Sequence, residues 1–178
     1  MRVIAGIHRG RKLQAPDTSD TRPVMDRVKE SLFSSIAAEV PGAAVLDLYA
    51  GAGSFGIEAL SRGAESAVFV ESGRAALMAL RANLETLRLE ADVFAGPAER
   101  FVQEDTRRFD LVFCDPPWPL DSGSVSMVLS HLVPRLDADT TVVVTRRTGD
   151  EAPEPHGLRI DDVRAHGDTT IIRYVMDQ

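Results

Sequence analysis

Short, strongly apolar segments alternate with amphipathic ones along most of the chain. Apolar runs of four or five residues predict buried strands, and apolar positions that recur every three or four residues predict helices. We expect strands at 44–48, 67–70, 92–95, 111–114 and 141–145, and helices at 54–61, after Ser72 as an N-cap, after Pro97 and around 125–132. Residues 158–163 and 169–175 predict two closing strands, at least one of them antiparallel.

Strands that alternate with helices are typical of a doubly wound α/β fold. We therefore predict a mostly parallel, seven-stranded sheet with an antiparallel C-terminal strand. Ahead of it, two apolar segments on either side of residues 8–11 predict a small N-terminal hairpin, and apolar residues from Val24 to Ile36 predict a helix that ends near Pro41 and Gly42. The length of 178 residues suits one domain, which we divide into a basic arm, 1–22, and a catalytic body, 23–178.

Composition is that of an ordinary globular protein, with 44% hydrophobic and 26% charged residues. No apolar run approaches the roughly 18 residues of a membrane span, and the N-terminus lacks the apolar core of a secretory signal, so we expect a cytoplasmic protein. The single cysteine, Cys114, excludes an intrachain disulfide and a cysteine-based zinc site, and the four histidines lack metal-ligand spacing. We expect a monomer without a metal, and we interpret Cys114 as core packing.

Basic residues gather near the N-terminus of a chain whose net charge is -7. Residues 1–30 hold seven basic and four acidic side chains, a net charge of +3, and the remainder holds 13 and 23, a net charge of -10. A basic arm on an acidic body fits a footprint for nucleic-acid phosphates, although charge alone supports a solvated surface equally well. The candidate RNA-binding residues are Arg9, Arg11, Lys12, Arg22 and Arg27.

A glycine-rich turn follows the strand predicted at 44–48. Gly51, Gly53 and Gly56 match the pattern G-x-G-x-x-G, in which glycine lets the backbone turn tightly and approach a ligand. Glu71, after the next strand, is placed to accept hydrogen bonds from ribose hydroxyls. The pattern favours a nucleotide-type ligand and leaves two cofactors open, a nicotinamide dinucleotide and S-adenosylmethionine. Asp47 favours the second, because its carboxylate can meet a cationic amino group; the alternative is that it caps a backbone N–H.

The strand predicted at 111–114 ends in Asp115-Pro116-Pro117-Trp118. Each proline restricts its own φ and the preceding residue, so Asp115 and the Pro116 carbonyl form two rigid acceptors beside a flat indole. The lone pair of a nucleobase amine is delocalised into the ring, and two acceptors that bind the amine hydrogens turn it out of the plane. Asp115 also stabilises positive charge that develops on nitrogen, and Trp118 can stack on an extruded base. The motif favours methylation of a nucleobase amine; the alternative is a turn with a core tryptophan.

An Asp-Pro-Pro-aromatic sequence at this place resembles the motif of amino-group methyltransferases that use S-adenosylmethionine. Over its whole length the chain resembles the bacterial 16S ribosomal RNA guanine-N2 methyltransferases. The resemblance is carried by residues 2–6, 9–13, 21–33, 47–64 and 167–170, and Arg-Pro-x-x-Asp-Arg-Val at 22–28 is more specific than the glycine turn. It implies a Rossmann-like class I methyltransferase fold and methylation of one guanine N2 in the assembled small ribosomal subunit.

Residues that match the family motifs take the roles that the resemblance implies. The cofactor-binding residues are then Asp47, Tyr49, Gly51, Gly53, Glu71 and Ala98, and the catalytic residues are Asp115, Pro116, Pro117 and Trp118. Two departures from the family pattern concern these sites. Gly96-Pro97-Ala98 carries no carboxylate, so the adenine amine must bind the backbone at Ala98 or the side chain of Glu99, and Trp118 replaces a more usual tyrosine or phenylalanine.

Three other functions use parts of the same pattern. A DNA adenine-N6 or cytosine-N4 methyltransferase shares the Asp-Pro-Pro-aromatic chemistry, but the chain leaves little room for a target-recognition domain. A dinucleotide oxidoreductase uses the glycine turn and gives no reason for the motif at 115–118. A non-enzymatic ribosome-assembly factor needs only the basic arm. Arg146 and Arg147 are interpreted as solvent-facing, with a contribution to an RNA surface as the alternative.

Overall fold

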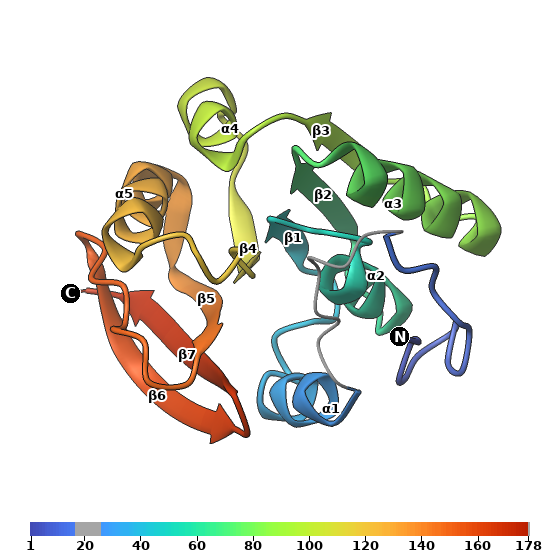
Figure 1. Cartoon of the computed structure of the whole chain (residues 1–178), viewed down its shortest axis with the longest axis horizontal. Coiled ribbons are helices and arrows are strands. Elements are labelled where there is room, and N and C mark those ends of the chain that lie inside the picture. Colours follow the sequence, from blue (N-terminus) through green and yellow to red (C-terminus); the bar gives the residue numbers. More distant parts are fainter. Residues whose placement is uncertain (17–25, 178) are drawn as a thin grey trace.

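The computed structural model describes residues 1–16 and 26–177. Strands and helices alternate as predicted (Figure 1). In chain order the elements are α1 (Asp26–Ser35), β1 (Ala44–Leu48), α2 (Ser54–Ser61), β2 (Ser66–Glu71), α3 (Arg74–Leu87), β3 (Asp92–Ala95), α4 (Ala98–Glu104), β4 (Phe109–Cys114), α5 (Ser122–Leu132), the short 3₁₀ helix η1 (Val133–Arg135), β5 (Leu136–Arg147), β6 (Leu158–His166) and β7 (Thr169–Met176).

The strands form one seven-stranded sheet in the order β3-β2-β1-β4-β5-β7-β6. β1 pairs in parallel with both β2 and β4, whereas β7 runs antiparallel to its two neighbours, β5 and β6. The predicted sheet with an antiparallel C-terminal strand is thereby confirmed. From β1 the chain continues to β2, which lies on one side of β1, and it later returns to β4, which lies on the other side of β1. Ligands of doubly wound sheets bind at this kind of switch point, outside the carboxyl ends of the strands.

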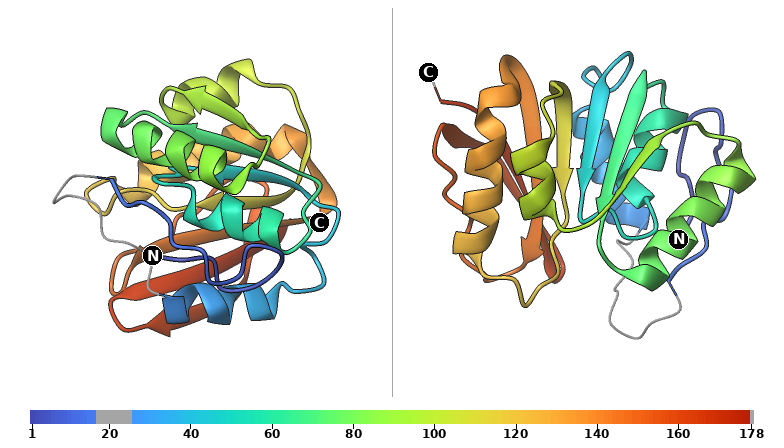
Figure 2. Two further views of the ribbon diagram at one scale, coloured as in Figure 1. Left: turned by 90° about the vertical axis from the view of Figure 1, so that its right-hand side faces the viewer. Right: turned by 90° about the horizontal axis from the view of Figure 1, so that it is seen from above.

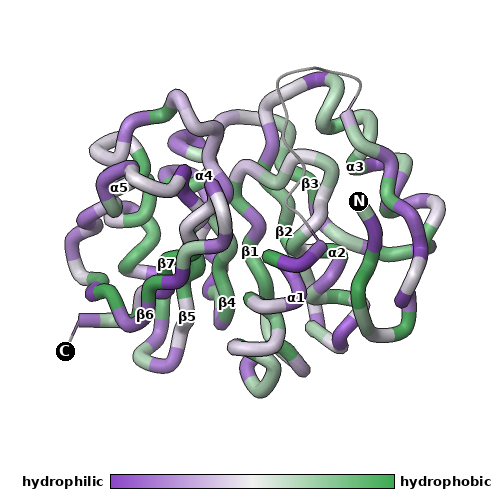
Figure 3. The backbone as a smooth tube through the Cα atoms, turned by 60° about the horizontal axis from the view of Figure 1, so that its bottom comes forward, coloured by the Kyte–Doolittle hydropathy of each residue, from purple (hydrophilic) through white to green (hydrophobic). Residues whose placement is uncertain are grey.

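Two apolar cores cover the two faces of the sheet. Successive residues of a strand point to opposite faces, so Val45 of β1 packs with α1, α2 and α3, whereas Leu46 packs with α4 and α5. Figure 1 shows these two groups of helices on the two sides of the sheet. Figure 3 shows hydrophobic residues along β1 and β2 at the centre of the molecule. Burial on both faces explains why the central strands read as continuous apolar runs.

The predicted N-terminal hairpin is present as one antiparallel bridge, between Arg2 and Lys12. Val3 and Leu13 are buried in the core shared with α1, α2 and α3. The backbone N–H of Gln14 donates to Oδ1 of Asn83 in α3 at 2.8 Å. Figure 2 shows the segment running beside α2 and α3. The described part of the basic arm is therefore packed onto the body.

The first helix ends earlier than predicted, at Ser35 rather than near Pro41 and Gly42. The hydroxyls of Ser34 and Ser35 donate to carbonyls of the preceding turn, on Glu30 and Leu32. Serine side chains that bond the backbone in this way compete with helix continuation. The chain then proceeds through turns to β1.

The predicted cap of α3 was also wrong. Ser72 does not cap the helix, which begins at Arg74 with Gly73 at its N-cap and no side-chain cap bond. The reason lies in Glu71, whose carboxylate accepts the backbone N–H groups of both Ser72 and Gly73.

Among the described residues, no helix is both long and apolar enough to cross a membrane.

Candidate active site

The predicted cofactor and catalytic residues lie at the carboxyl ends of four neighbouring strands. Residues 49–53 follow β1, Glu71 ends β2, Ala98 follows β3 and begins α4, and Asp115 follows β4. Because β3, β2, β1 and β4 are adjacent and parallel, these points share one edge of the sheet. The topology thus brings together residues that are up to 68 positions apart in the sequence, from Asp47 to Asp115.

The turn after β1 depends on left-handed backbone conformations, with φ of 58° at Tyr49, 57° at Gly51 and 87° at Gly53. A Cβ added at Gly53 would lie 2.5 Å from Cδ1 of Leu80, so this position needs glycine for its contact with α3. A Cβ added at Gly51 would meet no atom within 4 Å. The turn is therefore open at Gly51, where a ligand can approach the backbone.

Asp47 is fully buried in β1. Its Oδ2 accepts a hydrogen bond from the backbone N–H of Gly56 at 2.8 Å, as the capping alternative predicts, and its Oδ1 has no partner among the described residues. Burial raises the pKa of Asp47 well above its usual value; the Gly56 bond opposes this shift, and the nearby carboxylates of Asp115 and Glu71 add to it. The unpartnered Oδ1 is an acceptor that a cation or a bridging water would satisfy.

Glu71 joins the turns that follow β1 and β2. Its Oε2 accepts the backbone N–H of Gly51 at 2.7 Å, and its Oε1 accepts those of Ser72 and Gly73 at 2.9 and 2.6 Å. An ionised carboxylate has about four acceptor sites, so about one remains. A ribose that offers two hydroxyls must replace one of these bonds, and the bond to Gly51 lies in the open turn.

Tyr49 and Glu99 form a hydrogen bond at the same edge of the sheet. The hydroxyl of Tyr49 donates to Oε1 of Glu99 at 3.3 Å, and Glu99 lies in the first turn of α4, beside the buried Ala98. Burial raises the pKa of Tyr49 above its usual value, so the hydroxyl remains a donor at neutral pH. Both predicted partners of an adenine amine, Ala98 and Glu99, are therefore held close to the glycine turn.

Asp115 is fixed from two sides. Its backbone N–H donates to the carbonyl of Leu48 in β1 at 3.2 Å, and its Oδ1 accepts a hydrogen bond from the hydroxyl of Thr145 in β5. Burial raises the pKa of Asp115 to about 6, against the opposing effect of the Thr145 bond. At neutral pH the group is therefore an ionised, oriented acceptor.

The rest of the motif completes this acceptor. The carbonyl of Pro117 accepts the N–H of Leu120 at 2.9 Å, which leaves the carbonyl of Pro116 as the second candidate acceptor of the motif. Trp118 is half-buried, and the guanidinium carbon of Arg147 lies 5.6 Å from the centroid of its ring. The indole thus lies against a planar cation, which is the kind of stacking partner that a base also provides.

The two cofactors left open by the sequence differ in how they fit this edge. A pyrophosphate needs free N–H groups at the turn, but Gly51 donates to Glu71 and Gly56 donates to Asp47. The unpartnered Oδ1 of Asp47 suits a cationic amino group instead, and Glu71 suits a ribose. The residues present therefore fit S-adenosylmethionine better than a nicotinamide dinucleotide.

One expectation about the fifth strand was wrong, and one residue was missed. Arg146 is 3% exposed instead of solvent-facing. Side chains alternate along β5, so Arg146 shares the face of Val144, toward α4 and α5, while Thr145 points to the side of Asp115. Thr145 had a signal in the sequence, because it is a polar residue at the carboxyl end of a strand beside the motif.

Cys114 is buried, as predicted, and burial raises its thiol pKa.

The candidate RNA-binding residues that the structure describes are exposed, and Arg22 lies outside the described residues. They are Arg9, Arg11 and Lys12 in the hairpin and Arg27 on α1. The turn that holds Arg9 packs against the last residue of α2, where the backbone N–H of Ile7 donates to the carbonyl of Ser61 at 2.9 Å. α2 begins at the glycine turn and has eight residues, or roughly 12 Å. The basic turn therefore lies at the far end of α2 from the candidate active site.

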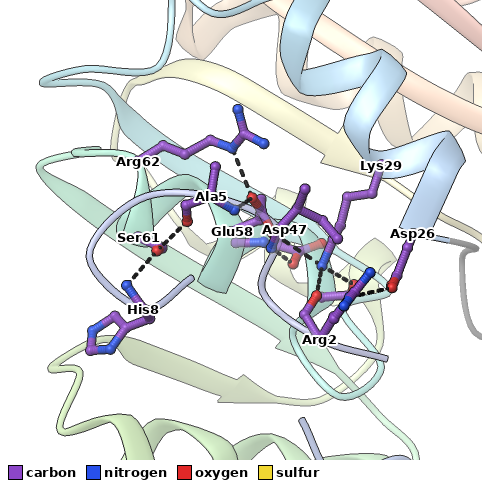
Figure 4. Close-up of polar contacts among 12 residues, drawn as sticks. Arg2, Ala5, His8, Asp26, Lys29, Asp47, Glu58, Ser61 and Arg62 are labelled. Atoms are coloured by element: carbon purple, nitrogen blue, oxygen red, sulfur yellow. Dashed lines mark hydrogen bonds and ion pairs between the residues drawn. The ribbon is translucent and has the colours of Figure 1, made fainter. Parts of the chain in front are cut away.

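A buried carboxylate holds the arm in this position (Figure 4). Glu58 of α2 is fully buried and accepts the backbone N–H groups of Ile4 and Ala5 at 2.8 and 3.0 Å. It also pairs with Lys29 of α1 at 3.2 Å and with Arg62 at 2.8 Å. Burial lowers the pKa of Lys29, and Glu58 opposes that shift. One charge cluster thus connects the arm, α1 and α2.

Two cavities lie at different ends of the sheet. One of about 890 Å³ is lined by Ala44, Ser66, Asp92 and Phe109, which begin β1 to β4, so it lies opposite the candidate active site. Another of about 370 Å³ lies beside Trp118. Within residues 1–16 and 26–177, no cluster of three or more histidine, cysteine or acidic side chains could hold a metal ion.

Comparison with known proteins identifies the family. The sequence model of the family described as Conserved hypothetical protein 95 matches residues 1–175. The chain belongs to this family. The Bacillus subtilis (strain 168) protein YlbH, named as a candidate rRNA methyltransferase, is 38% identical over 162 residues, which cover 88% of each chain. Ribosomal RNA small subunit methyltransferase D of Escherichia coli K12 is 42% identical over 119 residues, 66% of this chain and 60% of that protein. The family expected from the sequence motifs is confirmed.

Solved structures show the same architecture. The Escherichia coli protein yhhF, named as a candidate methyltransferase, superposes with a TM-score of 0.87 at 32% identity, over 99% of this chain and 98% of that one. A magnesium protoporphyrin IX methyltransferase from Synechocystis PCC 6803, solved with bound S-adenosylmethionine, gives a TM-score of 0.66 at 15% identity, over 85% and 79% of the two chains. At that identity the likeness concerns the fold alone, and it confirms the Rossmann-like class I methyltransferase fold.

Proposed function

We propose that this protein transfers a methyl group from S-adenosylmethionine to the exocyclic N2 amine of a guanine in small-subunit ribosomal RNA, within the assembled subunit. The observation that carries the proposal is the geometry of Asp115, an ionised acceptor held by Thr145 and followed directly by the rigid carbonyl of Pro116. Relatives named for methylation of ribosomal RNA support the substrate class.

The residues of the motif activate a weak nucleophile. When bound, S-adenosylmethionine supplies a methyl group on a positively charged sulfur, and the N–C bond to guanine forms as the C–S bond breaks. Asp115 and the carbonyl of Pro116 accept the two hydrogens of N2, which turns its lone pair out of the ring plane. As positive charge develops on N2, the carboxylate of Asp115 stabilises it. The surplus proton then leaves N2 to Asp115 or to water.

The remaining site residues divide between cofactor and RNA. Asp47 and the residues around it hold the methyl donor: Tyr49, Gly51, Gly53, Glu71 and Ala98. Pro117 and Trp118 position the base, which must leave its stack to reach Asp115. The exposed basic residues Arg9, Arg11, Lys12 and Arg27, together with Arg22, bind phosphates of the flanking RNA. The protein acts in the cytoplasm as a monomer without a metal.

Methyl transfer from labelled S-adenosylmethionine to small subunits from cells that lack this protein tests the proposal. We expect label in N2-methylguanosine after nucleoside analysis, and faster transfer to subunits than to naked 16S ribosomal RNA. Asp115→Asn should lower turnover about 10²–10³-fold, because one preorganised acceptor is weakened, while the affinity for S-adenosylhomocysteine stays the same. Label in adenine or in DNA would contradict the substrate, and binding of NAD without binding of S-adenosylhomocysteine would contradict the reaction.

A further inference from the structure

A buried arginine beside the catalytic motif has unpaired donors. Arg146 is 3% exposed, and its Nε and Nη1 have no hydrogen-bond partner within the described parts of the chain. Its Nη2 donates to Oδ2 of Asp150 at 3.5 Å, which is a long bond. Burying donors without partners costs free energy, so these groups call for a further acceptor beyond those that the described residues supply.

The position of Arg146 connects it to the substrate. Thr145, its neighbour in β5, bonds Asp115, and Arg146 points to the opposite face of the sheet at the same edge. Arg146 also lines the cavity of about 370 Å³ that is bounded by Trp118. This volume falls within the range of small-molecule sites, roughly 300–1,000 Å³. The arginine therefore borders the space beside the indole that is expected to stack on the target base.

The charges around the cavity select the chemistry of its ligand. Asp121, Asp150 and Glu151 line the cavity together with Arg146, so acidic groups outnumber the one guanidinium. A phosphate is repelled by this lining, whereas a neutral ring with an acceptor edge is not. Guanine presents two adjacent acceptors, O6 and N7, and a bidentate arginine is the commonest specific partner of that edge. A guanine ring fits the charges better than a backbone phosphate.

We propose that Arg146 is the specificity-determining residue for the target base and donates to O6 and N7 of the guanine whose N2 is held by Asp115. The assignment rests on the proposed function. The N2 amine and the O6/N7 edge lie on different sides of the purine, as Asp115 and Arg146 lie on different sides of the strand ends. Binding in this way requires the guanidinium of Arg146 to turn toward the cavity and to give up the 3.5 Å bond to Asp150.

Two base analogues that keep the 2-amine separate this role from catalysis. Small subunits are reconstituted with guanine, 7-deazaguanine or 2-aminopurine at the mapped target position; the second base lacks N7 and the third lacks O6. We expect the wild-type protein to prefer guanine over each analogue in kcat/KM, by about 10-fold, because each analogue removes one of the two acceptors of a bidentate contact. Arg146→Met should lower kcat/KM on guanine to the level of the analogues, so that both ratios fall to about one.

Two further variants complete the test. Arg146→Lys keeps the charge without the planar fork, so it should also lose the discrimination while remaining folded. Arg135→Met is the matched control, because Arg135 also has a buried Nη1 that finds no partner in the described part of the chain, and it does not line the cavity; its ratios should equal those of the wild type. Methylation of guanine with unchanged ratios in both Arg146 variants would overturn this assignment alone. A wild type that methylates none of the three substrates would overturn the proposed function and the assignment with it.

Discussion

At the scale of single residues, burial and the hydrogen bond from Thr145 shift the pKa of Asp115 in opposite directions. Burial raises the pKa of Asp115 to about 6, and the hydrogen bond from Thr145 opposes that rise. Only the ionised carboxylate accepts the hydrogens of the base amine. We therefore expect the single-turnover rate of methyl transfer to be level above this pKa and to fall about tenfold per pH unit below it. A rate that rises as the pH falls through 6 would contradict the role of Asp115.

Removing the hydroxyl of Thr145 tests the effect of its hydrogen bond on the pKa of Asp115. Thr145→Val deletes a bond that favours the ionised form, so the acid limb of the pH–rate profile should move to higher pH. Thr141→Val is a matched control, because Thr141 lies on the same strand and face and pairs with Leu111, away from the motif. The assignment fails if the two variants give the same profile.

The sequence indicates which residues are candidates for the site better than it indicates how deeply each is buried and what it contacts. Asp115 was identified because a charge and two prolines are unusual at the end of an apolar strand. Arg146 was misplaced because the fifth strand was predicted to end at Thr145, which left Arg146 in a loop, where exposure is the usual state. The strand in fact continues to Arg147, paired with β7, and the alternation of side chains then turns Arg146 inward.

At the scale of elements, regular periodicity predicts most of the body. The bounds of β1, α2 and β3 agree with those predicted. Burial explains this for β1 and α2, whereas β3 is a partly exposed edge strand whose bounds follow from the turn residues after it. Side chains that bond nearby backbone decide the exceptions, as at Ser35 and Glu71. The attachment of the arm could not be predicted either, because it depends on Glu58, whose partners are 29 to 54 residues away except for Arg62.

Glu58 should therefore control both stability and the order of the arm. Glu58→Gln removes from the buried Lys29, and from Arg62, the carboxylate that each pairs with among the described residues, which should lower the free energy of unfolding by about 3–5 kcal/mol. The amide hydrogens of Ile4 and Ala5, which Glu58 accepts, should exchange faster in native-state hydrogen exchange.

The control for this prediction is Glu104→Gln. Glu104 pairs with Arg100 on the exposed surface of α4, so its loss should change stability little. Equal stability of the two variants, with unchanged exchange at Ile4 and Ala5, would show that the buried cluster does not hold the arm.

At the scale of the whole molecule, the acidic body and the basic arm divide two tasks. The candidate active site lies at the switch point between β1 and β4, and the turn that holds Arg9 lies at the far end of α2. The sequence predicts the charge asymmetry but not this separation, which follows from how the arm packs on α2 and α3. Because the separation is roughly one eight-residue helix, we expect the arm to contact RNA beyond the target nucleotide.

Substitution of the exposed basic residues of the hairpin should weaken RNA binding without affecting the cofactor. Each phosphate contact contributes about 0.7–0.9 to the slope of log affinity against log salt, so the triple variant Arg9→Ala, Arg11→Ala, Lys12→Ala should flatten that slope by about two to three units. The triple variant Arg108→Ala, Arg159→Ala, Arg164→Ala removes three exposed arginines outside the arm and should leave the slope unchanged. Binding of S-adenosylhomocysteine should be the same in both variants, because neither set lies at the carboxyl ends of β1 and β2. Titration of small subunits over a range of salt concentrations measures the slopes, and equal slopes for the two variants would mean that the arm does not bind phosphates.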